Sequence, residues 1–260
     1  MATSRFATVA LNVPLLPPLT YRIAETMSPC VGDRCVVPLG RRQEVGLIVG
    51  LSDQTTIDPK KQKTIIRLLN ETEPVSEIWL KLTRFAADYY QHSWGEVSIA
   101  ALPTFFKTKP GPKYEQSLER LRKPYKEKKI DKPSGVLTLN DEQQLAVEAV
   151  DHAKGFAPYV LHGVTGSGKT EVYLRMMESL FVKKPDAQVL FLVPEINLTP
   201  QLEARIRNHF PDKPMASLHS GLANGERAKA WLAAKEKRIQ ILVGTRMAIF
   251  SDMPNLELIV

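Results

Sequence analysis

The fold of the second half of this chain is decided by one stretch, Gly163-Val164-Thr165-Gly166-Ser167-Gly168-Lys169-Thr170. It matches the pattern G-x-x-x-x-G-K-[ST] in full, between an apolar run and an amphipathic stretch. Glycines let backbone N–H groups approach phosphate oxygens, and the following helix adds positive charge at its N-terminus. We expect all eight residues to bind a nucleoside triphosphate, with Lys169 reaching its β- and γ-phosphates and Thr170 holding Mg²⁺. The alternative is a Gly-rich turn with an exposed lysine.

The residues around this motif alternate between apolar runs and helical stretches. The apolar runs lie at 159–162, 188–193, 215–218, 239–243 and 256–260, and the helical stretches at 171–182, 198–210 and 225–237. This alternation is typical of a parallel sheet covered by helices on both faces. We therefore expect residues 139–260 to form an α/β domain.

Hydrolysis of the nucleotide also needs a carboxylate, at the end of a neighbouring strand, that holds Mg²⁺ and orients water. The expected position follows the strand at 256–260, where the sequence ends. Asp252 and Glu257 are the nearest acids, and neither follows this strand. We expect this chain to bind nucleotide but to hydrolyse it poorly.

Residues 1–104 show a different pattern, with short β-like runs at 6–13, 34–39, 44–51 and 64–69. A helix then begins near residue 74, in which Ile78, Leu82, Phe85, Ala86 and Tyr89 recur at helical spacing. We expect this apolar stripe to be buried, and a platform for stacking bases is the alternative. The sequence thus predicts a small β-rich domain with one long helix.

Most of the positive charge lies between these two domains. The chain has a net charge of +7, and residues 105–138 carry ten Lys or Arg against four Asp or Glu. Because this stretch is also rich in proline, it is predicted to be a basic linker, with a short helix possible at 113–123. The linker is either a solvated tether or a strap that binds a polyanion.

The composition excludes several other classes of protein. No run approaches the length of about 18–20 apolar residues that a membrane span needs, so we expect no membrane contact. Cys30 and Cys35 are the two cysteines. They are too few for a disulfide framework or a four-ligand zinc site, so we expect reduced thiols in a cytoplasmic protein.

Several motifs together resemble the superfamily 2 helicases, in the versions found in the primosomal protein N′ (PriA) family of replication-restart DNA helicases. These motifs lie at 139–143, 163–173, 193–201, 218–221 and 244–250, and weaker likeness at 9–15 and 86–90 extends to that family's DNA-binding domain. The resemblance covers about 1–104 and 139–260. It implies a β-rich domain that binds DNA 3′ ends, followed by an incomplete RecA-like lobe.

The family likeness also assigns roles to single residues. It implies that Gln143 reads adenine, which favours ATP as the nucleotide. It further implies that Thr199, Gln201, Thr245 and Arg246 grip single-stranded DNA through phosphates, without reading bases. Helix capping is the alternative role of the two threonines.

The resemblance places a pocket for the 3′ end of a nascent strand at Leu19, Thr20, Gly40 and Lys63. Gly40 would admit a base, and Lys63 would contact a phosphate. Relatives can show an aromatic residue followed by an acid where this sequence has Leu19 and Thr20. Stacking on Leu19 would be weaker, while Thr20 could still hydrogen-bond a terminal hydroxyl.

Three parts of the family pattern are missing: a winged-helix domain, the second motor lobe with its arginine finger, and a cysteine-rich zinc insertion. We therefore interpret the chain as an N-terminal fragment, with zinc expected only in the missing C-terminal part. The parent protein would be an ATP- and Mg²⁺-dependent 3′→5′ helicase that acts on forked and single-stranded DNA near the nucleoid. Primosome and single-strand-binding proteins are the partners implied by resemblance. The rival hypotheses are a non-catalytic DNA-binding fragment and an unrelated P-loop ATPase.

Overall fold

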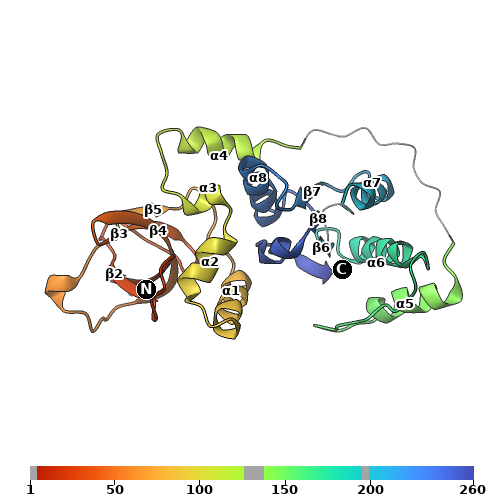
Figure 1. Cartoon of the computed structure of the whole chain (residues 1–260), viewed down its shortest axis with the longest axis horizontal. Helices are drawn as coiled ribbons and strands as arrows, with labels where there is room; N and C mark the ends of the chain where they lie inside the picture. Colours follow the sequence, from red (N-terminus) through yellow and green to blue (C-terminus); the bar gives the residue numbers. More distant parts are fainter. Residues whose placement is uncertain (1–4, 126–137, 195–198) are drawn as a thin grey trace. The chain divides into compact units, whose positions relative to one another are not determined.

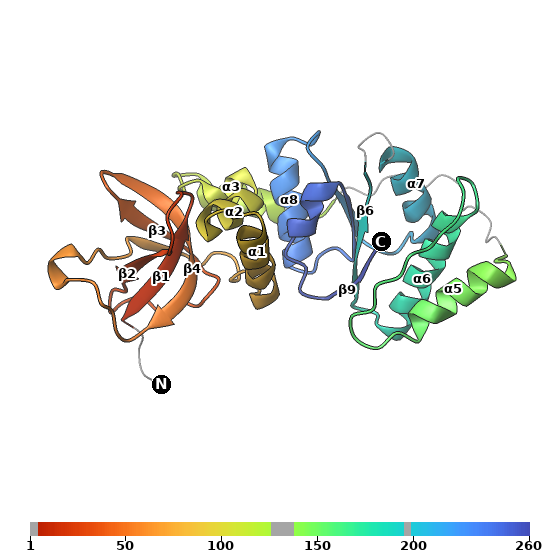
Figure 2. The ribbon, with the colours of Figure 1, turned by 60° about the horizontal axis from the view of Figure 1, so that its bottom comes forward.

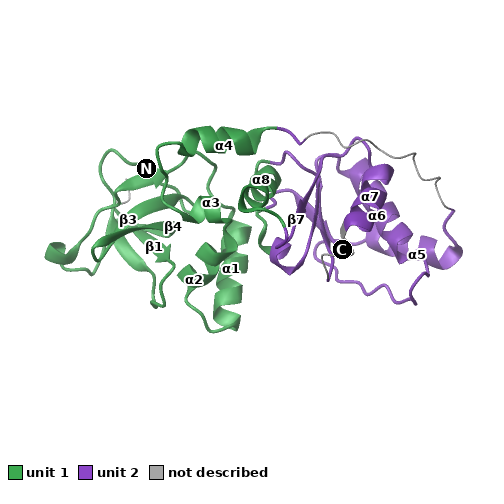
Figure 3. Cartoon of the chain, turned by 45° about the horizontal axis from the view of Figure 1, so that its top comes forward, with its two compact units in different colours: residues 1–123, 222–236, 250–252 green, residues 124–221, 237–249, 253–260 purple. Residues whose placement is uncertain are grey.

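The computed structural model describes residues 5–125, 138–194 and 199–260 (Figure 1). The chain divides into two compact units (Figure 3). Unit 1 consists of Met1–Lys123, Leu222–Glu236 and Phe250–Asp252, and unit 2 of Pro124–Gly221, Lys237–Ile249 and Met253–Val260. Unit 1 contains an antiparallel sheet and unit 2 a parallel one, which confirms the expected α/β class.

Unit 1 begins with a five-stranded antiparallel sheet in the order β2-β1-β4-β3-β5. Its strands are β1 (Phe6–Leu11), β2 (Leu19–Arg22), β3 (Arg34–Leu39), β4 (Arg42–Ser52) and β5 (Arg67–Leu69). A short 3₁₀ helix, η1 (Pro59–Lys61), precedes β5. All four strands that the sequence predicts in this region are present, and β2 is an additional one.

Residues 63–66 join the two ends of this sheet. Arg22 in β2 donates its N–H to the Lys63 carbonyl at 2.8 Å and accepts from the N–H of Ile65 at 3.0 Å. Ile66 donates to the Val36 carbonyl in β3 at 2.9 Å. The sheet therefore curls around its own apolar core, whose buried members are Ala7, Val9, Leu11, Tyr21, Ile23, Cys35, Val37, Ile48 and Ile65.

Helix α1 (Glu77–Tyr89) buries a different face from the predicted one. Ile78, Phe85 and Tyr89 are 75%, 66% and 68% exposed, so that prediction is wrong for these three. The buried residues are Trp79, Leu80, Thr83, Ala86 and Ala87. The helix has apolar residues on two sides, and local spacing cannot tell which side meets the core.

Helix α2 (Trp94–Ala101) packs directly on β1. A Cβ atom added at Gly95 would lie 1.8 Å from the Leu11 carbonyl oxygen, so only glycine fits there. Ser93 caps the helix by accepting the N–H of Glu96, and its hydroxyl also lies 2.8 Å from the carbonyl oxygen of Val13, to which it donates. These contacts fix the helical layer against the sheet.

Part of the expected linker is folded. Helices α3 (Thr104–Lys107) and α4 (Tyr114–Arg122) belong to unit 1, where Phe106 and Leu118 are 0% and 2% exposed. The short helix considered possible at 113–123 is α4. Helix α3 and the packing of both helices on α8 (Asn224–Lys235) were not predicted, because α8 lies more than a hundred residues later in the chain. Residues 126–137, the rest of the basic stretch apart from Thr138, lie outside the described residues.

Arg34 ties β3 to this helical segment. Its guanidinium donates to the Phe106 carbonyl at 3.1 Å, to the Tyr114 hydroxyl at 3.1 Å and to the Thr72 hydroxyl at 3.3 Å. The residue is only 4% exposed, and the guanidinium also lies over the Phe106 ring. Buried donors need such partners, so Arg34 orders the sheet and both helices together.

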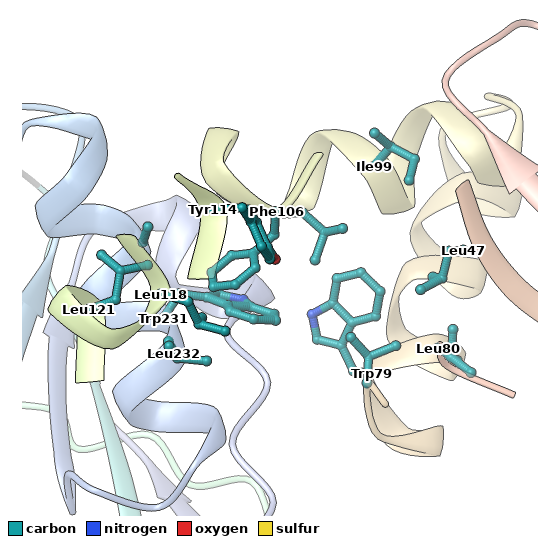
Figure 4. Close-up of a cluster of buried hydrophobic side chains, with 13 residues drawn as sticks. Leu47, Trp79, Leu80, Ile99, Phe106, Tyr114, Leu118, Leu121, Trp231 and Leu232 are labelled. Atoms are coloured by element: carbon teal, nitrogen blue, oxygen red, sulfur yellow. The ribbon is translucent and has the colours of Figure 1, made fainter. Parts of the chain in front are cut away.

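Helix α8 (Asn224–Lys235) completes the core of unit 1. Figure 4 shows Trp231 and Leu232 beside Leu118, Phe106 and Tyr114, and this cluster also contains Trp79, Leu80 and Ile99. The alternation of apolar and helical stretches predicts the helix at 225–237 to be part of the nucleotide-binding domain. Instead, the chain crosses between the units five times, so unit 1 is built from three separate stretches.

A buried ion pair fixes two of these stretches. Lys235 Nζ lies 2.8 Å from Asp252 Oδ2, and their side chains are 4% and 0% exposed. The same Oδ2 accepts the Ser76 N–H at 3.0 Å, and Lys235 also donates to the Pro74 carbonyl. Helix α8 and residues 250–252 are thus anchored at the start of α1.

Unit 2 has a four-stranded parallel sheet in the order β7-β8-β6-β9. Its strands are β6 (Gln188–Leu192), β7 (Met215–Leu218), β8 (Ile241–Gly244) and β9 (Leu256–Ile259). Its helices are α5 (Asp141–Asp151), α6 (Lys169–Lys183) and α7 (Thr199–His209). A 3₁₀ helix, η3 (Arg246–Phe250), follows β8. Side chains of α6 and α7 pack on β6, β7 and β8. Helices α5 and α6 lie side by side (Figure 2).

The predicted strand at 159–162 is not formed. Val160 is 92% exposed and Tyr159 52%, while Leu161 packs beside Leu258 in a small cluster under α5 and α6. A strand needs a hydrogen-bonded neighbour, and the described sheet ends at β9. The apolar run therefore stays extended chain that leads into the Gly-rich loop.

Candidate nucleotide and nucleic-acid sites

The loop 163–170 has the backbone that its glycines predict. Gly166 and Gly168 both have φ of +82°, in the left-handed region where side chains are strained. Gly168 is also the N-cap of α6, and a Cβ added there would lie 2.5 Å from Gln143 Nε2. The loop therefore leads with glycine backbone into the N-terminus of a 15-residue helix, where unpaired N–H groups favour a phosphate.

Lys169 is bound by the loop itself. Its Nζ donates to the Gly163 carbonyl at 2.6 Å and to the Val164 carbonyl at 2.8 Å. A triphosphate would replace these two neutral acceptors with charged oxygens, and hydrogen bonds between charged groups are the stronger ones. The residues thus fit a nucleotide, which would draw Lys169 away from the loop carbonyls.

Gln143 links helix α5 to the loop. Its Nε2 donates to the Ser167 carbonyl at 3.1 Å, while its Oε1 accepts the Asn140 N–H at 3.0 Å. Asn140 in turn accepts the Gln143 N–H through its side chain, which completes a capping box. This second role of Gln143 was not predicted, although an Asn followed three residues later by Gln is a capping signal.

The two acids nearest the expected Mg²⁺ ligand are engaged elsewhere. Glu257 lies within β9 and pairs with Lys184 at 2.7 Å. Asp252 is held by Lys235 in unit 1. Among the described residues, no cluster of three or more His, Cys, Asp or Glu side chains has the geometry to hold a metal ion. Thr170, the predicted Mg²⁺ residue, is the second residue of α6.

A second candidate site lies at the carboxyl ends of the parallel strands. The strand register places Leu192, Gly244 and Leu218 in one row, so the segments that follow them emerge at the same edge. This is the edge at which open α/β sheets bind ligands. Thr245 and Arg246 follow Gly244 there, with Arg246 exposed.

Close packing fixes the start of this segment. A Cβ added at Gly244 would lie 2.4 Å from Ala248 Cβ and 2.6 Å from the Leu218 carbonyl oxygen, and Thr245 donates its N–H to that oxygen at 3.2 Å. Thr199 opens α7 and Gln201 is exposed in its first turn. Residues 195–198 and the side chain of Thr199 lie outside the described part of the chain.

The predicted 3′-end residues all lie in unit 1. Leu19 and Thr20 are the first two residues of β2, and Lys63 lies beside that strand through the Arg22 hydrogen bond. Gly40 forms the turn between β3 and β4, with φ of +59° and open space where a Cβ would be. Leu19 packs partly against the apolar core of the sheet, which leaves less of its side chain for stacking.

Two family models match this chain. Residues 8–103 match the 3′ DNA-binding domain (3′BD) of PriA, and residues 136–258 match the res subunit of type III restriction enzymes. The first match covers the sheet and helices α1 and α2 of unit 1. The second covers the Gly-rich loop and the parallel sheet, and it also includes α8.

Curated relatives agree with these matches. The chain is 29% identical to the replication restart protein PriA of Haemophilus influenzae, over 97% of this chain and 43% of the relative. It is 30% identical to the protein of that name from Treponema pallidum, over 97% of this chain and 37% of the relative. The corresponding Synechocystis protein is 47% identical over 122 residues, which are 47% of this chain and 14% of the relative.

The Haemophilus and Treponema relatives thus match nearly all of this chain, but the chain spans less than half of their length. Among the described residues, no helix has both the length and the apolar character that a membrane crossing would require. The two domain matches follow one another in the order that the motifs indicated. This chain therefore resembles, over nearly all its length, the N-terminal part of the replication restart proteins PriA.

Proposed function

We propose that this chain is the N-terminal part of an ATP-dependent 3′→5′ DNA helicase of replication restart and primosome assembly. In this role residues 1–104 bind the 3′ end of a DNA strand at a fork, and the lobe at 139–260 binds Mg²⁺-ATP and single-stranded DNA. The observation that carries the proposal is the glycine-built loop at the start of α6, in a chain whose first domain matches a 3′ DNA-binding domain.

The chain's own residues would act in distinct steps. Backbone N–H groups of the loop and Lys169 would bind the phosphates, and Gln143 would exchange its loop contact for the adenine. The Thr170 hydroxyl would help to hold Mg²⁺, which when bound neutralises negative charge on the phosphates. Thr245 and Arg246 would hold the DNA backbone at the carboxyl edge of the sheet.

A second candidate function is a binding fragment that takes up DNA and nucleotide without hydrolysis. The occupied acids favour it for this chain, because Asp252 and Glu257 are both committed to lysine partners. By resemblance we place the parent protein in the cytoplasm with the nucleoid, in contact with forked DNA, primosome proteins and single-strand-binding protein.

The first test of this proposal is fluorescence anisotropy with forked DNA that ends in a 3′-hydroxyl or a 3′-phosphate. Capture of the strand end predicts tighter binding of the free hydroxyl, because a terminal phosphate adds bulk and charge in the pocket. Equal affinity for both ends would rule out end capture.

The second test separates the nucleotide site from DNA binding. Lys169→Ala should abolish binding of a fluorescent ATP analogue while leaving DNA affinity nearly intact, because a phosphate loses its main cationic partner. Lys184→Ala is the matched control, since this exposed lysine pairs with Glu257 at the other end of the sheet. If Lys169→Ala loses both ATP-analogue binding and DNA binding, the two sites are not separate.

A further inference from the structure

Glu171 is a buried acid in the first turn of α6, directly after the predicted Mg²⁺ residue Thr170. Its side chain is only 8% exposed, although glutamate is rarely buried without a partner. The position continues an apolar stripe of α6, because Leu174, Met177 and Phe181 follow it at spacings of three, three and four residues. Stable packing here needs only another apolar side chain, so the charge calls for an explanation.

The carboxylate of Glu171 joins α6 to α7. Its Oε2 accepts from Arg205 Nη2 at 3.2 Å, and Arg205 lies in α7. Its Oε1 lies 3.5 Å from Arg175 Nε, one turn later in α6. Each oxygen therefore faces one guanidinium, which compensates the buried charge. Arg175 also pairs with Glu178 at 2.8 Å, so it keeps a negative partner if Glu171 is neutralised.

On the loop side, Glu171 is bound to the glycine that opens the helix. Its backbone N–H donates to the Gly168 carbonyl at 2.9 Å, and Gly168 has the left-handed φ of +82° on which the loop depends. Lys169 is held by two loop carbonyls, which it would leave for a triphosphate. Because Glu171 is fixed to the loop, a movement of the helix start would carry its carboxylate along.

On the other side, Arg205 lies four residues after Gln201, which is predicted to bind single-stranded DNA. Residues four apart lie on the same face of a helix, and both of these residues are exposed. Thr199, another predicted DNA contact, is the first residue of α7. Because a packed helix moves as one rigid element, a displacement of Arg205 also displaces the first turn of α7.

We propose that Glu171 is a positioning residue, which through its ion pair with Arg205 couples nucleotide binding at the Gly-rich loop to the contact of α7 with single-stranded DNA. This inference rests on the proposed function, since it requires both ligands to bind. The apolar side chains of α6 and α7 pack in one cluster and hold the helices together (Figure 2). The ion pair adds a link whose energy depends on the distance and direction of two charged groups, so it responds to a shift of the loop.

The test measures the coupling between the two ligands in the full chain. A fluorescent, non-hydrolysable ATP analogue with Mg²⁺ is titrated without DNA and with saturating oligothymidylate, which ends in a 3′-phosphate so that end capture contributes little. The ratio of the two dissociation constants is the coupling factor, and the reverse titration must give the same factor. Coupling between two sites is typically about 5- to 150-fold, and we expect a factor in this range for the wild type.

Glu171→Gln retains the shape of the side chain and removes its charge. It should bring the coupling factor close to about 1, while the affinity for the analogue measured without DNA stays near that of the wild type, because this side chain is directed at α7. Arg205→Gln should have the same effect. The double variant should lose no more than either single one, since all three remove the same ion pair.

Two further variants separate coupling from packing. Glu171→Leu with Arg205→Met replaces the pair by apolar side chains, which as a rule preserves stability, and it should still abolish the coupling. The control is Asp151→Asn, because Asp151 joins α6 to α5 instead of α7: it accepts from the Ser179 hydroxyl at 2.7 Å and pairs with Lys183 at 3.2 Å. This variant should retain the wild-type coupling factor. Far-UV circular dichroism of each variant establishes that its helices are folded.

The outcomes separate this inference from the proposed function. A wild-type chain that binds both ligands independently would overturn the coupling role of Glu171 and leave the proposed function intact. That role is also refuted if Glu171→Gln keeps the wild-type coupling factor, if the apolar pair restores it, or if Asp151→Asn loses it equally. A chain that binds neither the ATP analogue nor DNA would refute the proposed function as well.

Discussion

The buried pair of Lys235 and Asp252 offers the sharpest test of how unit 1 is assembled. Asp252→Asn keeps the size of the side chain and places a neutral amide where Oδ2 now meets Lys235 and the Ser76 N–H. The lysine would then remain buried, at 4% exposure, without a negative partner. The other carboxylate oxygen, Oδ1, is buried with no partner among the described residues, so the new amide group gains no contact there.

The magnitude follows from burial. Breaking one side of a fully buried ion pair costs about 3–5 kcal/mol, because the remaining charge is left uncompensated. Asp88→Asn provides the matched control, since Asp88 pairs with Arg84 at 2.9 Å but both side chains are about half exposed. An exposed pair in a helix contributes less than about 0.5 kcal/mol.

The assay is urea unfolding followed by tryptophan fluorescence. All three tryptophans of the chain, Trp79, Trp94 and Trp231, belong to unit 1, so the signal reports this unit alone. With an m-value of about 2 kcal/mol per molar urea, the midpoint of Asp252→Asn should fall by about 1.5–2.5 M. The midpoint of Asp88→Asn should stay within about 0.3 M of the wild type.

If both variants unfold at the same urea concentration, the pair does not hold the three stretches of unit 1 together. A lower m-value for Asp252→Asn with an unchanged urea midpoint would also contradict a stabilising role of the pair. The substitution would then have changed the compactness of the unfolded or native state.

Three further predictions follow from buried and strained positions. Cys30 is exposed and Cys35 is buried, so iodoacetamide should modify Cys30 rapidly and Cys35 only on unfolding. Mass spectrometry would measure both rates, and equal rates would contradict this packing. Burial raises the pKa of the Cys35 thiol and of the Tyr21 phenol to about 12 each. In the unfolded chain these pKa values are about 8.5 and 10. The stability that the two neutral side chains provide is therefore complete below those unfolded values and is lost as the pH rises towards 12. A urea midpoint that does not fall over this alkaline range would refute that reasoning. Gly168→Ala should weaken ATP-analogue binding, since a side chain is strained at its φ of +82° and the added Cβ, 2.5 Å from Gln143 Nε2, would displace that amide from the loop. Gly155→Ala, also at positive φ but outside the loop and with open space for a Cβ, should bind normally. Equal binding in both variants would mean that the loop adapts to a side chain.

The candidate nucleotide site could be predicted from sequence because its eight residues are contiguous. The glycines set the backbone that the loop needs, and α6 begins at Lys169 as the motif requires. Most elements of the two sheets were also predicted from short apolar runs. What failed was the strand at 159–162, because an apolar run becomes a strand only when another strand pairs with it.

The residues predicted to bind a DNA end depend more heavily on tertiary structure. Arg22 and Lys63 are forty-one positions apart in the sequence, and only the hydrogen bond between their backbones brings them together. The neighbourhood of β2 and Lys63 is visible only once residues 63–66 are seen to pair with Arg22.

By itself the sequence determined the class of each half and the backbone of the Gly-rich loop, because alternation of apolar runs and the conformational freedom of glycine are local properties. The tertiary structure decided which face of α1 is buried, and that α4 and α8 both belong to the core of unit 1. Those outcomes depend on contacts such as Trp231 with Phe106, between residues more than a hundred positions apart. No local pattern encodes such a pair, since burial of one side chain is defined only by the others that cover it.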